Sequence, residues 1–229
     1  MTMPFYVPPE QLVKDRADFA RKGIGRGRPI VVVQIASGIL LVGENGSPSL
    51  RKIGEIYDRI AFAGVGRFNE FETLRVAGVR HADLKGFSYA RSDVTGKGLA
   101  NAYSQTLGQV FSHEVTPYEV DIVEAEVGAD LEGDKLFRIQ FDGTLRDANG
   151  LAVLGAEEDE ITRVLEDAAD PAMTLEEAIR TACSAIEQAT EREIPPGAWE
   201  TAFLDRASPR RAFTRLTADE VAAALSLIH

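Results

Sequence analysis

The sequence predicts an α+β fold in which antiparallel β-sheet is covered by helices. Segments with the two-residue period of strands come in blocks joined by short turns, whereas segments with the helical period come mostly in pairs. The order is a helix, four strands, two helices, about four strands, two helices, two strands and a helix, without the strict β-α-β alternation of a parallel sheet. No internal repeat or linker divides the 229 residues, so we expect one domain over residues 1–229.

The composition narrows the classes of function. A chain with 45% hydrophobic and 27% charged residues builds an ordinary core, and at this length it needs no disulfide or metal to do so. The net charge of −11 argues against a nucleic-acid partner and against an anionic membrane surface, because both require a clustered basic face. Cys183 is the only cysteine, which excludes an internal disulfide and favours a cytoplasmic location.

The predicted centre of the fold is a hairpin over residues 28–43. Two runs of β-branched and aliphatic residues, 30–35 and 39–43, are separated by Ala36, Ser37 and Gly38. Glycine adopts the backbone conformations of a tight turn at little cost, so we expect two buried strands joined at Gly38. A buried hairpin needs cover on both faces, which the remaining elements supply.

The N-terminal segment divides into a tail and a helix. Residues 1–8 are apolar, punctuated by proline and without a period, which is typical of a disordered end. Pro8 and Pro9 open a helix over residues 9–24, because proline is tolerated in a first helical turn. Its expected buried face comprises Val13, Ala17, Ala20 and Ile24.

The other elements follow from period, turns and caps. Thr174 with Glu177, and Thr217 with Glu220, form two capping boxes that begin helices. Asp142-Gly143 and Asn149-Gly150 predict short turns. We expect strands over 50–60, 61–65, 120–127, 135–141, 199–204 and 212–216, and helices over 69–80, 95–113, 161–168, from 174 onwards and from 217 onwards.

No side chains stand at spacings typical of a catalytic or metal site. The histidines His81, His113 and His229 are scattered, and Cys183 is best interpreted as a small core residue. Lys52 differs, because core packing does not require a base in its strand-like run. An exposed lysine that discourages edge pairing is the alternative interpretation of Lys52.

Segments along nearly the whole chain resemble the α-subunits of actinobacterial proteasomes. They are Pro9-Glu10-Gln11, Ala20-Arg21-Lys22-Gly23, the hairpin over 30–43, Leu50-Arg51-Lys52-Ile53-Gly54-Glu55-Ile56-Tyr57-Asp58-Arg59, Gly66-Arg67-Phe68-Asn69-Glu70-Phe71-Glu72, Asp93-Val94-Thr95-Gly96, Leu99-Ala100-Asn101, Pro117-Tyr118-Glu119-Val120 and Pro209-Arg210-Arg211-Ala212-Phe213.

This resemblance implies the four-layer α-β-β-α sandwich of the N-terminal-nucleophile hydrolases. Two antiparallel sheets flanked by helices would occupy residues 28–229, with an extra N-terminal helix over 9–24. The resemblance implies seven-membered α rings that cap β rings, with α as the non-catalytic partner and no cofactor or metal. The implied partners are β-subunits, neighbouring α-subunits, a hexameric AAA ATPase activator and tagged unfolded protein substrates.

The residues themselves argue against catalysis. Catalytic β-subunits of this fold begin their first strand with a threonine whose free amine activates its own hydroxyl. Here the first strand begins Arg28-Pro29-Ile30, and a helix precedes it. Glu44 stands where β-subunits carry an acidic partner, but we expect it to have no lysine or threonine to work with. The chain is therefore predicted to be inert toward peptides.

Recognition and gating remain as the predicted roles. In relatives, the C-terminal carboxylate of an activator docks against a lysine, and Lys52 matches that position, with Gly23 and Gly66 framing the groove. The tail would close the axial pore, although it lacks the Tyr-Asp-Arg triplet of archaeal and eukaryotic relatives. Its residues are Met1, Thr2, Met3, Pro4, Phe5, Tyr6, Val7 and Pro8.

Two alternatives stay open beside a gating subunit of a 20S core. One is a catalytically active threonine hydrolase of the same fold, which the missing threonine at Arg28 disfavours. The other is an unrelated α+β binding module.

Overall fold

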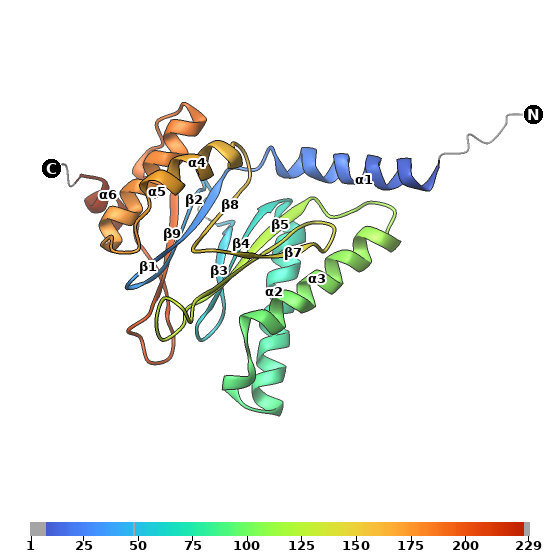
Figure 1. Ribbon diagram of the computed structural model, residues 1–229, viewed down its shortest axis with the longest axis horizontal. Helices are drawn as coiled ribbons and strands as arrows, with labels where there is room; N and C mark the ends of the chain where they lie inside the picture. Colours follow the sequence, from blue (N-terminus) through green and yellow to red (C-terminus); the bar gives the residue numbers. More distant parts are fainter. Residues whose placement is uncertain (1–7, 48, 227–229) are drawn as a thin grey trace, which may run out of the picture.

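Two five-stranded antiparallel sheets form the centre of the computed structural model, which describes residues 8–47 and 49–226 (Figure 1). The first sheet has the order β10 (Phe213–Arg215), β9 (Trp199–Asp205), β2 (Gly38–Glu44), β1 (Ile30–Ile35) and β8 (Leu151–Leu154). The second has the order β3 (Ile53–Tyr57), β4 (Ile60–Gly66), β5 (Val120–Glu126), β6 (Lys135–Ile139) and β7 (Leu145–Ala148).

Helices cover the outer face of each sheet. Buried side chains of α4 (Glu158–Ala168), α5 (Leu175–Thr190) and α6 (Ala218–Ser226) pack on the first sheet, and those of α2 (Phe68–Ser88) and α3 (Gly96–His113) pack on the second. Two 3₁₀ turns, η1 (Arg91–Asp93) and η2 (Pro196–Ala198), lie in the connections. The layers are helices, sheet, sheet and helices, which confirms the predicted α-β-β-α sandwich.

The hairpin of β1 and β2 occupies the middle of the first sheet, between β8 and β9. Side chains alternate between two layers: Ile30 and Val32 enter the core between the sheets, whereas Val31 and Val33 enter the core beneath the helices. Both faces are therefore buried, which explains the nearly continuous apolar run. A β-carbon at Gly38 would overlap the carbonyl oxygen of Leu204 on β9, so the turn position also needs glycine for close packing.

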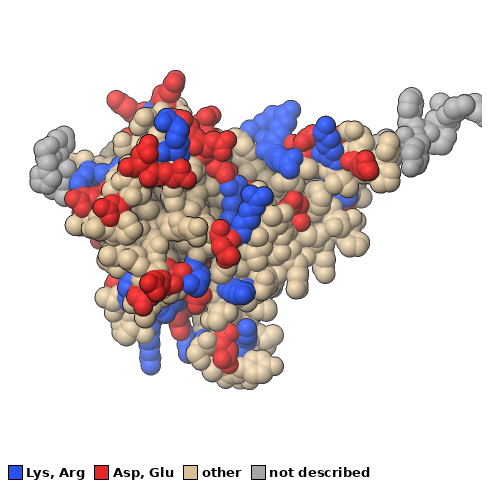
Figure 2. All heavy atoms as spheres, viewed as in Figure 1, with Lys and Arg blue, Asp and Glu red and all other residues tan. Residues whose placement is uncertain are grey.

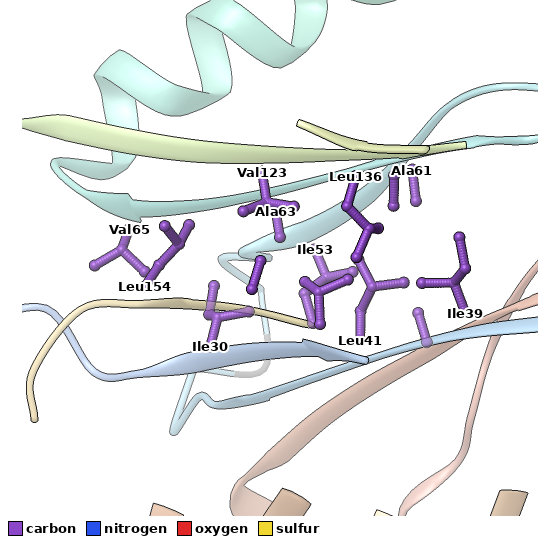
Figure 3. Close-up of a cluster of buried hydrophobic side chains, with 14 of the residues drawn as sticks. Ile30, Ile39, Leu41, Ile53, Ala61, Ala63, Val65, Val123, Leu136 and Leu154 are labelled. Carbon is purple, nitrogen blue, oxygen red and sulfur yellow. The ribbon is translucent and has the colours of Figure 1, made fainter. Parts of the chain in front are cut away.

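The core between the sheets joins residues that are distant in sequence. Figure 3 shows Ile30, Ile39 and Leu41 of the first sheet facing Val123 and Leu136 of the second. All five are at most 4% exposed. This layer fixes the first sheet over the second, and with it the relative position of the strand ends described below.

Helix α1 (Pro9–Ile24) is present as predicted, but its predicted apolar face is only partly buried. Ala20 and Ile24 are buried, whereas Val13 is 54% exposed. Figure 1 shows why, since the helix extends away from the sandwich and only its C-terminal end reaches the sheets. Leu12 and Phe19 are also exposed along this helix.

Several predicted boundaries were wrong. Helix α2 continues past the predicted end at Arg80 to Ser88. In this extension Ala82 is buried, whereas the larger apolar side chains Leu84 and Phe87 are exposed, so its apolar residues follow no single buried face. The strand predicted from residue 50 begins at Ile53. Asn149-Gly150 does form a turn, but it carries the chain from β7 in one sheet to β8 in the other.

The surface carries both signs of charge. On the face shown in Figure 2, Lys and Arg are interleaved with Asp and Glu, and acidic side chains gather over the region of α4. None of the helices in the described part of the chain is long and apolar enough to cross a membrane.

Candidate functional site

The candidate site lies where β1 begins and β2 ends. The antiparallel register places Ile30 opposite Gly43, so Arg28 before β1 meets Glu44 at the end of β2. The Arg28 guanidinium forms an ion pair with Glu44. Arg192 approaches the same carboxylate from beyond α5, with 2.7 Å between Nη2 and Oε2. Two guanidinium groups therefore hold Glu44, whose side chain is 3% exposed.

Lys52 joins this cluster from the segment just before β3. Its Nζ donates a hydrogen bond to the carbonyl oxygen of Arg28 at 3.1 Å. Burial, and then repulsion by the Arg28 guanidinium, lower the pKa of Lys52 to about 8, partly offset by the negative charges of Glu200 and Glu44. Lys52 is half-buried and faces this cluster, which does not fit the alternative of an exposed edge lysine.

Glu44 therefore has a lysine in its surroundings, contrary to the sequence-based expectation. The spacing of Glu44 and Lys52 in the chain did not reveal this, because the contact depends on how the two sheets meet. A threonine hydrolase needs, besides an acid and a lysine, a nucleophile with a free amine at the first strand. This nucleophile is missing, since Arg28 stands inside the chain after α1 and carries neither a hydroxyl group nor a free amine. The site combines an acid and a lysine with no nucleophile at the first strand.

Gly23 and Gly66 both lie against Glu119. A β-carbon at Gly66, where φ is +121°, would overlap the backbone carbonyl oxygen of Glu119, and one at Gly23 would overlap its carboxylate. Glu119 is buried and forms an ion pair with Arg67. The close approach that these glycines permit here is that of the chain's own Glu119.

The backbone before β1 connects the glycines to Lys52. A β-carbon at Gly27 would lie 3.4 Å from the amide nitrogen of Gly66, and the next residue, Arg28, supplies the carbonyl oxygen that Lys52 binds. The segment 23–28 thus begins at Gly23, passes Gly66 and ends at Arg28, whose carbonyl oxygen binds Lys52. Of the predicted gate, Met1 to Val7 lie outside the described residues. Pro8 is exposed, and its carbonyl oxygen accepts hydrogen bonds from the first turn of α1.

Sequence reasoning missed Glu200 on β9. The residue is 2% exposed, and its carboxylate accepts hydrogen bonds from the backbone N–H groups of Lys52 and Ile53, at 3.0 and 3.2 Å. The available signal was a glutamate within the apolar run 199–204, at the same alternation as the inward-facing Ala202 and Leu204. Among the described residues, no cluster of three or more His, Cys, Asp or Glu side chains could hold a metal ion.

A four-layer α-β-β-α sandwich with an additional N-terminal helix, in which Arg28 and Pro29 precede the first strand, defines the class of the protein: a subunit with the fold of the N-terminal-nucleophile hydrolases. A family model described as "Proteasome subunit" matches residues 24–198, so the chain belongs to the proteasome subunit family. This finding excludes an unrelated binding module.

Relatives named "Proteasome subunit alpha" cover almost the whole chain. The protein from Xylanimonas cellulosilytica is 54% identical over 226 residues, which cover 94% of this chain and 93% of the relative. The protein from Kineococcus radiotolerans is 52% identical over 99% of this chain and 99% of the relative. The protein from Thermomonospora curvata is 51% identical over 96% of this chain and 96% of the relative. The similarity to actinobacterial α-subunits predicted from the motifs is confirmed, and it supports a non-catalytic subunit.

Proposed function

We propose that this chain forms the outer seven-membered rings of a 20S proteasome core in the cytoplasm, gates its pore and docks a hexameric AAA ATPase that delivers tagged unfolded proteins. The single observation that carries the proposal is the geometry at β1. Arg28 occupies the place of a nucleophile, while Lys52 remains as an ammonium group facing its carbonyl oxygen. A site that has lost the nucleophile and kept the cation is suited to binding a carboxylate.

Lys52 provides the docking charge in this proposal. Because its pKa is about 8, most of the lysine is protonated at pH 7. An ammonium group has three N–H donors, and the bond to Arg28 uses one of them. The terminal carboxylate of an activator chain would take another, in a groove framed by Gly23 and Gly66.

The docking role is tested by Lys52→Ala in the assembled core. We expect loss of ATPase-stimulated protein degradation with nearly unchanged basal hydrolysis of a short peptide, because the variant removes the charge and leaves the β-subunits intact. Lys97→Ala, at an exposed lysine in the first turn of α3, is the matched control and should retain stimulation. Normal stimulation of the Lys52 variant would contradict the docking role.

Ring assembly is tested by native mass spectrometry of the tagged chain from its own cells. We expect a particle of several hundred kilodaltons that contains this chain and a second, processed chain in equal numbers. A lone chain of 24.9 kDa would contradict the assembly role.

One observation favours the second candidate, an active threonine hydrolase: Lys52 and Glu44 lie in one charged cluster at the start of β1. Activity would require cleavage of the chain before a hydroxyl residue, to create a free amine beside the nucleophile. Intact-mass measurement of the assembled chain decides this, and an uncleaved N-terminal region excludes the candidate.

A further inference from the structure

Glu200 binds four donors from three separate segments of the chain. Oε2 accepts the N–H of Lys52 at 3.0 Å and Nδ2 of Asn45 at 2.6 Å, and Oε1 accepts the N–H of Ile53 at 3.2 Å and Nη1 of Arg215 at 2.6 Å. The side chain is 1% exposed. A buried carboxylate with this many donors has one well-defined position.

Arg215 completes the connection by donating from Nη2 to the carbonyl oxygen of Ile53 at 2.7 Å. Strand β3 is the edge of its sheet, so the N–H and C=O of Ile53 point away from β4 and have no neighbouring strand. Glu200 and Arg215 supply the partners that a further strand would have supplied. They fix the start of β3, and Lys52 immediately before it, to the first sheet.

We propose that Glu200 is the positioning residue of Lys52: it holds the Lys52 backbone in place and sets a buried negative charge beside the ammonium, which is thereby presented as a cation to a peptide C-terminal carboxylate. The functional consequence rests on the docking role proposed above, whereas the link between Glu200 and the Lys52 backbone rests on the hydrogen bond alone.

The charges around Lys52 determine what removal of Glu200 should do. Arg28 faces the ammonium from the segment before β1, Glu44 from β2 and Glu200 from β9. Glu200 is the larger of the two influences that raise the pKa of Lys52, against burial and Arg28. Without its charge the pKa of Lys52 falls below about 8, so a larger share of the lysine is neutral near pH 7.

The test measures the reactivity of Lys52 directly in the assembled core. Brief pulses of acetic anhydride between pH 6 and 10, followed by mass spectrometry of the Lys52 peptide, give the pH at which the amine becomes reactive. We expect an inflection near pH 8 in the wild type, and a lower one in Glu200→Gln with a three- to tenfold faster reaction at about pH 7. Thr201→Val, at the next and buried position of β9, is the control and should keep the wild-type profile.

The direction of the change separates positioning from general damage. A Glu200 variant that merely opened the structure would move the inflection up, toward the value near 10.4 of a solvated lysine. An upward shift, or no shift, would overturn the inference. Arg215→Gln removes the cation that shares the charge of Glu200, so its inflection should rise. If Glu200→Gln does not assemble, this variant takes its place: an inflection that rises while the midpoint of urea denaturation stays at the wild-type value supports the inference, and an unchanged profile overturns it.

Stimulation by the ATPase distinguishes this inference from the docking role. In Glu200→Gln we expect stimulation to persist at pH 6.5 and to be lost at pH 8, a steeper loss than in the wild type. If Lys52→Ala keeps normal stimulation, docking at Lys52 fails, while the acylation profile still decides whether Glu200 controls Lys52.

Discussion

Arg206 binds Asp134 through two parallel hydrogen bonds, 2.6 Å from Nη1 to Oδ1 and 2.7 Å from Nη2 to Oδ2. Their side chains are 12% and 2% exposed. The same guanidinium donates to the carbonyl oxygen atoms of Ile35, Ala36, Gly128 and Asp130. One side chain therefore joins the β1–β2 turn, the loop before β6 and the end of β9.

Replacement of Arg206 by methionine should lower the free energy of unfolding by about 3–5 kcal/mol, because Asp134 would remain as a buried charge without its cation. Urea denaturation measures this loss. Arg211→Met is the control, since Arg211 and Glu55 form an exposed pair and its removal should change stability little. Equal losses of unfolding free energy in the two variants would contradict the larger contribution of the buried pair to stability.

Gly66→Ala and Gly23→Ala should both destabilise the chain, but for different reasons. At Gly66 the positive φ and the overlap with the Glu119 carbonyl oxygen give a loss of about 2 kcal/mol or more, because backbone must move. At Gly23 the overlap is with the Glu119 side chain.

A double-mutant cycle separates the two cases by urea denaturation. Glu119→Ala should relieve much of the cost of Gly23→Ala, because it removes the overlapping carboxylate, and little of the cost of Gly66→Ala. Similar relief at both positions would refute the assignment of the backbone overlap to Gly66.

Glu124 on β5 should make the chain less stable as the pH rises. The carboxyl group is fully buried, and neither oxygen has a hydrogen-bond partner among the described residues. Burial, and then the charge of Glu126, raise the pKa of Glu124 well above its ordinary value. The folded chain then holds a proton that the unfolded chain releases, so stability falls as the pH rises from the unfolded pKa toward the folded one.

The Glu124→Gln variant has no carboxyl proton to release on unfolding. Its unfolding free energy should therefore rise relative to that of the wild type between pH 5 and pH 8. Urea denaturation at both pH values tests this, with Glu132→Gln in the exposed loop before β6 as the control. A constant difference between Glu124→Gln and the wild type would mean that Glu124 titrates normally.

Deletion of residues 1–8 should raise peptide hydrolysis by the assembled core without any activator, if these residues close the pore. The apolar, proline-rich sequence precedes the exposed start of α1, which lies far from the sandwich (Figure 1). Basal hydrolysis of a fluorogenic peptide by the two core particles is the measurement. An unchanged rate would assign the gate elsewhere.

Local sequence patterns predicted much of the fold because their physical causes are local. The hairpin around Gly38 follows from side-chain alternation and turn chemistry, and the box at Thr174 follows from two reciprocal hydrogen bonds within one helical turn. The turn at Asn149-Gly150 shows the limit, since its residues specify a change of direction but not which sheet the next strand joins.

The candidate site was predictable only in part. Lys52 stood out because a base is unexpected beside a buried strand. Glu200 did not stand out, because it lies 148 positions from Lys52 and accepts a hydrogen bond from the backbone N–H of that residue. Almost every residue has such an N–H group, so the sequence carries no signal for this bond. The proximity of Glu44 to Lys52 likewise depends on how two sheets meet, which no periodicity encodes.

Helix α1 has one further consequence for kinetics. Its C-terminal end is held by Ala20 and Ile24, whereas Leu12 and Val13 on its first turns contact little of the sandwich. The first turns of this 16-residue helix therefore depend on local helical hydrogen bonds, which are marginal in water without tertiary packing. Amide hydrogens in those turns should exchange with deuterium far faster than those of β1. Their exchange should slow when another subunit covers them, so the exchange rate of these amides would report the time course of assembly.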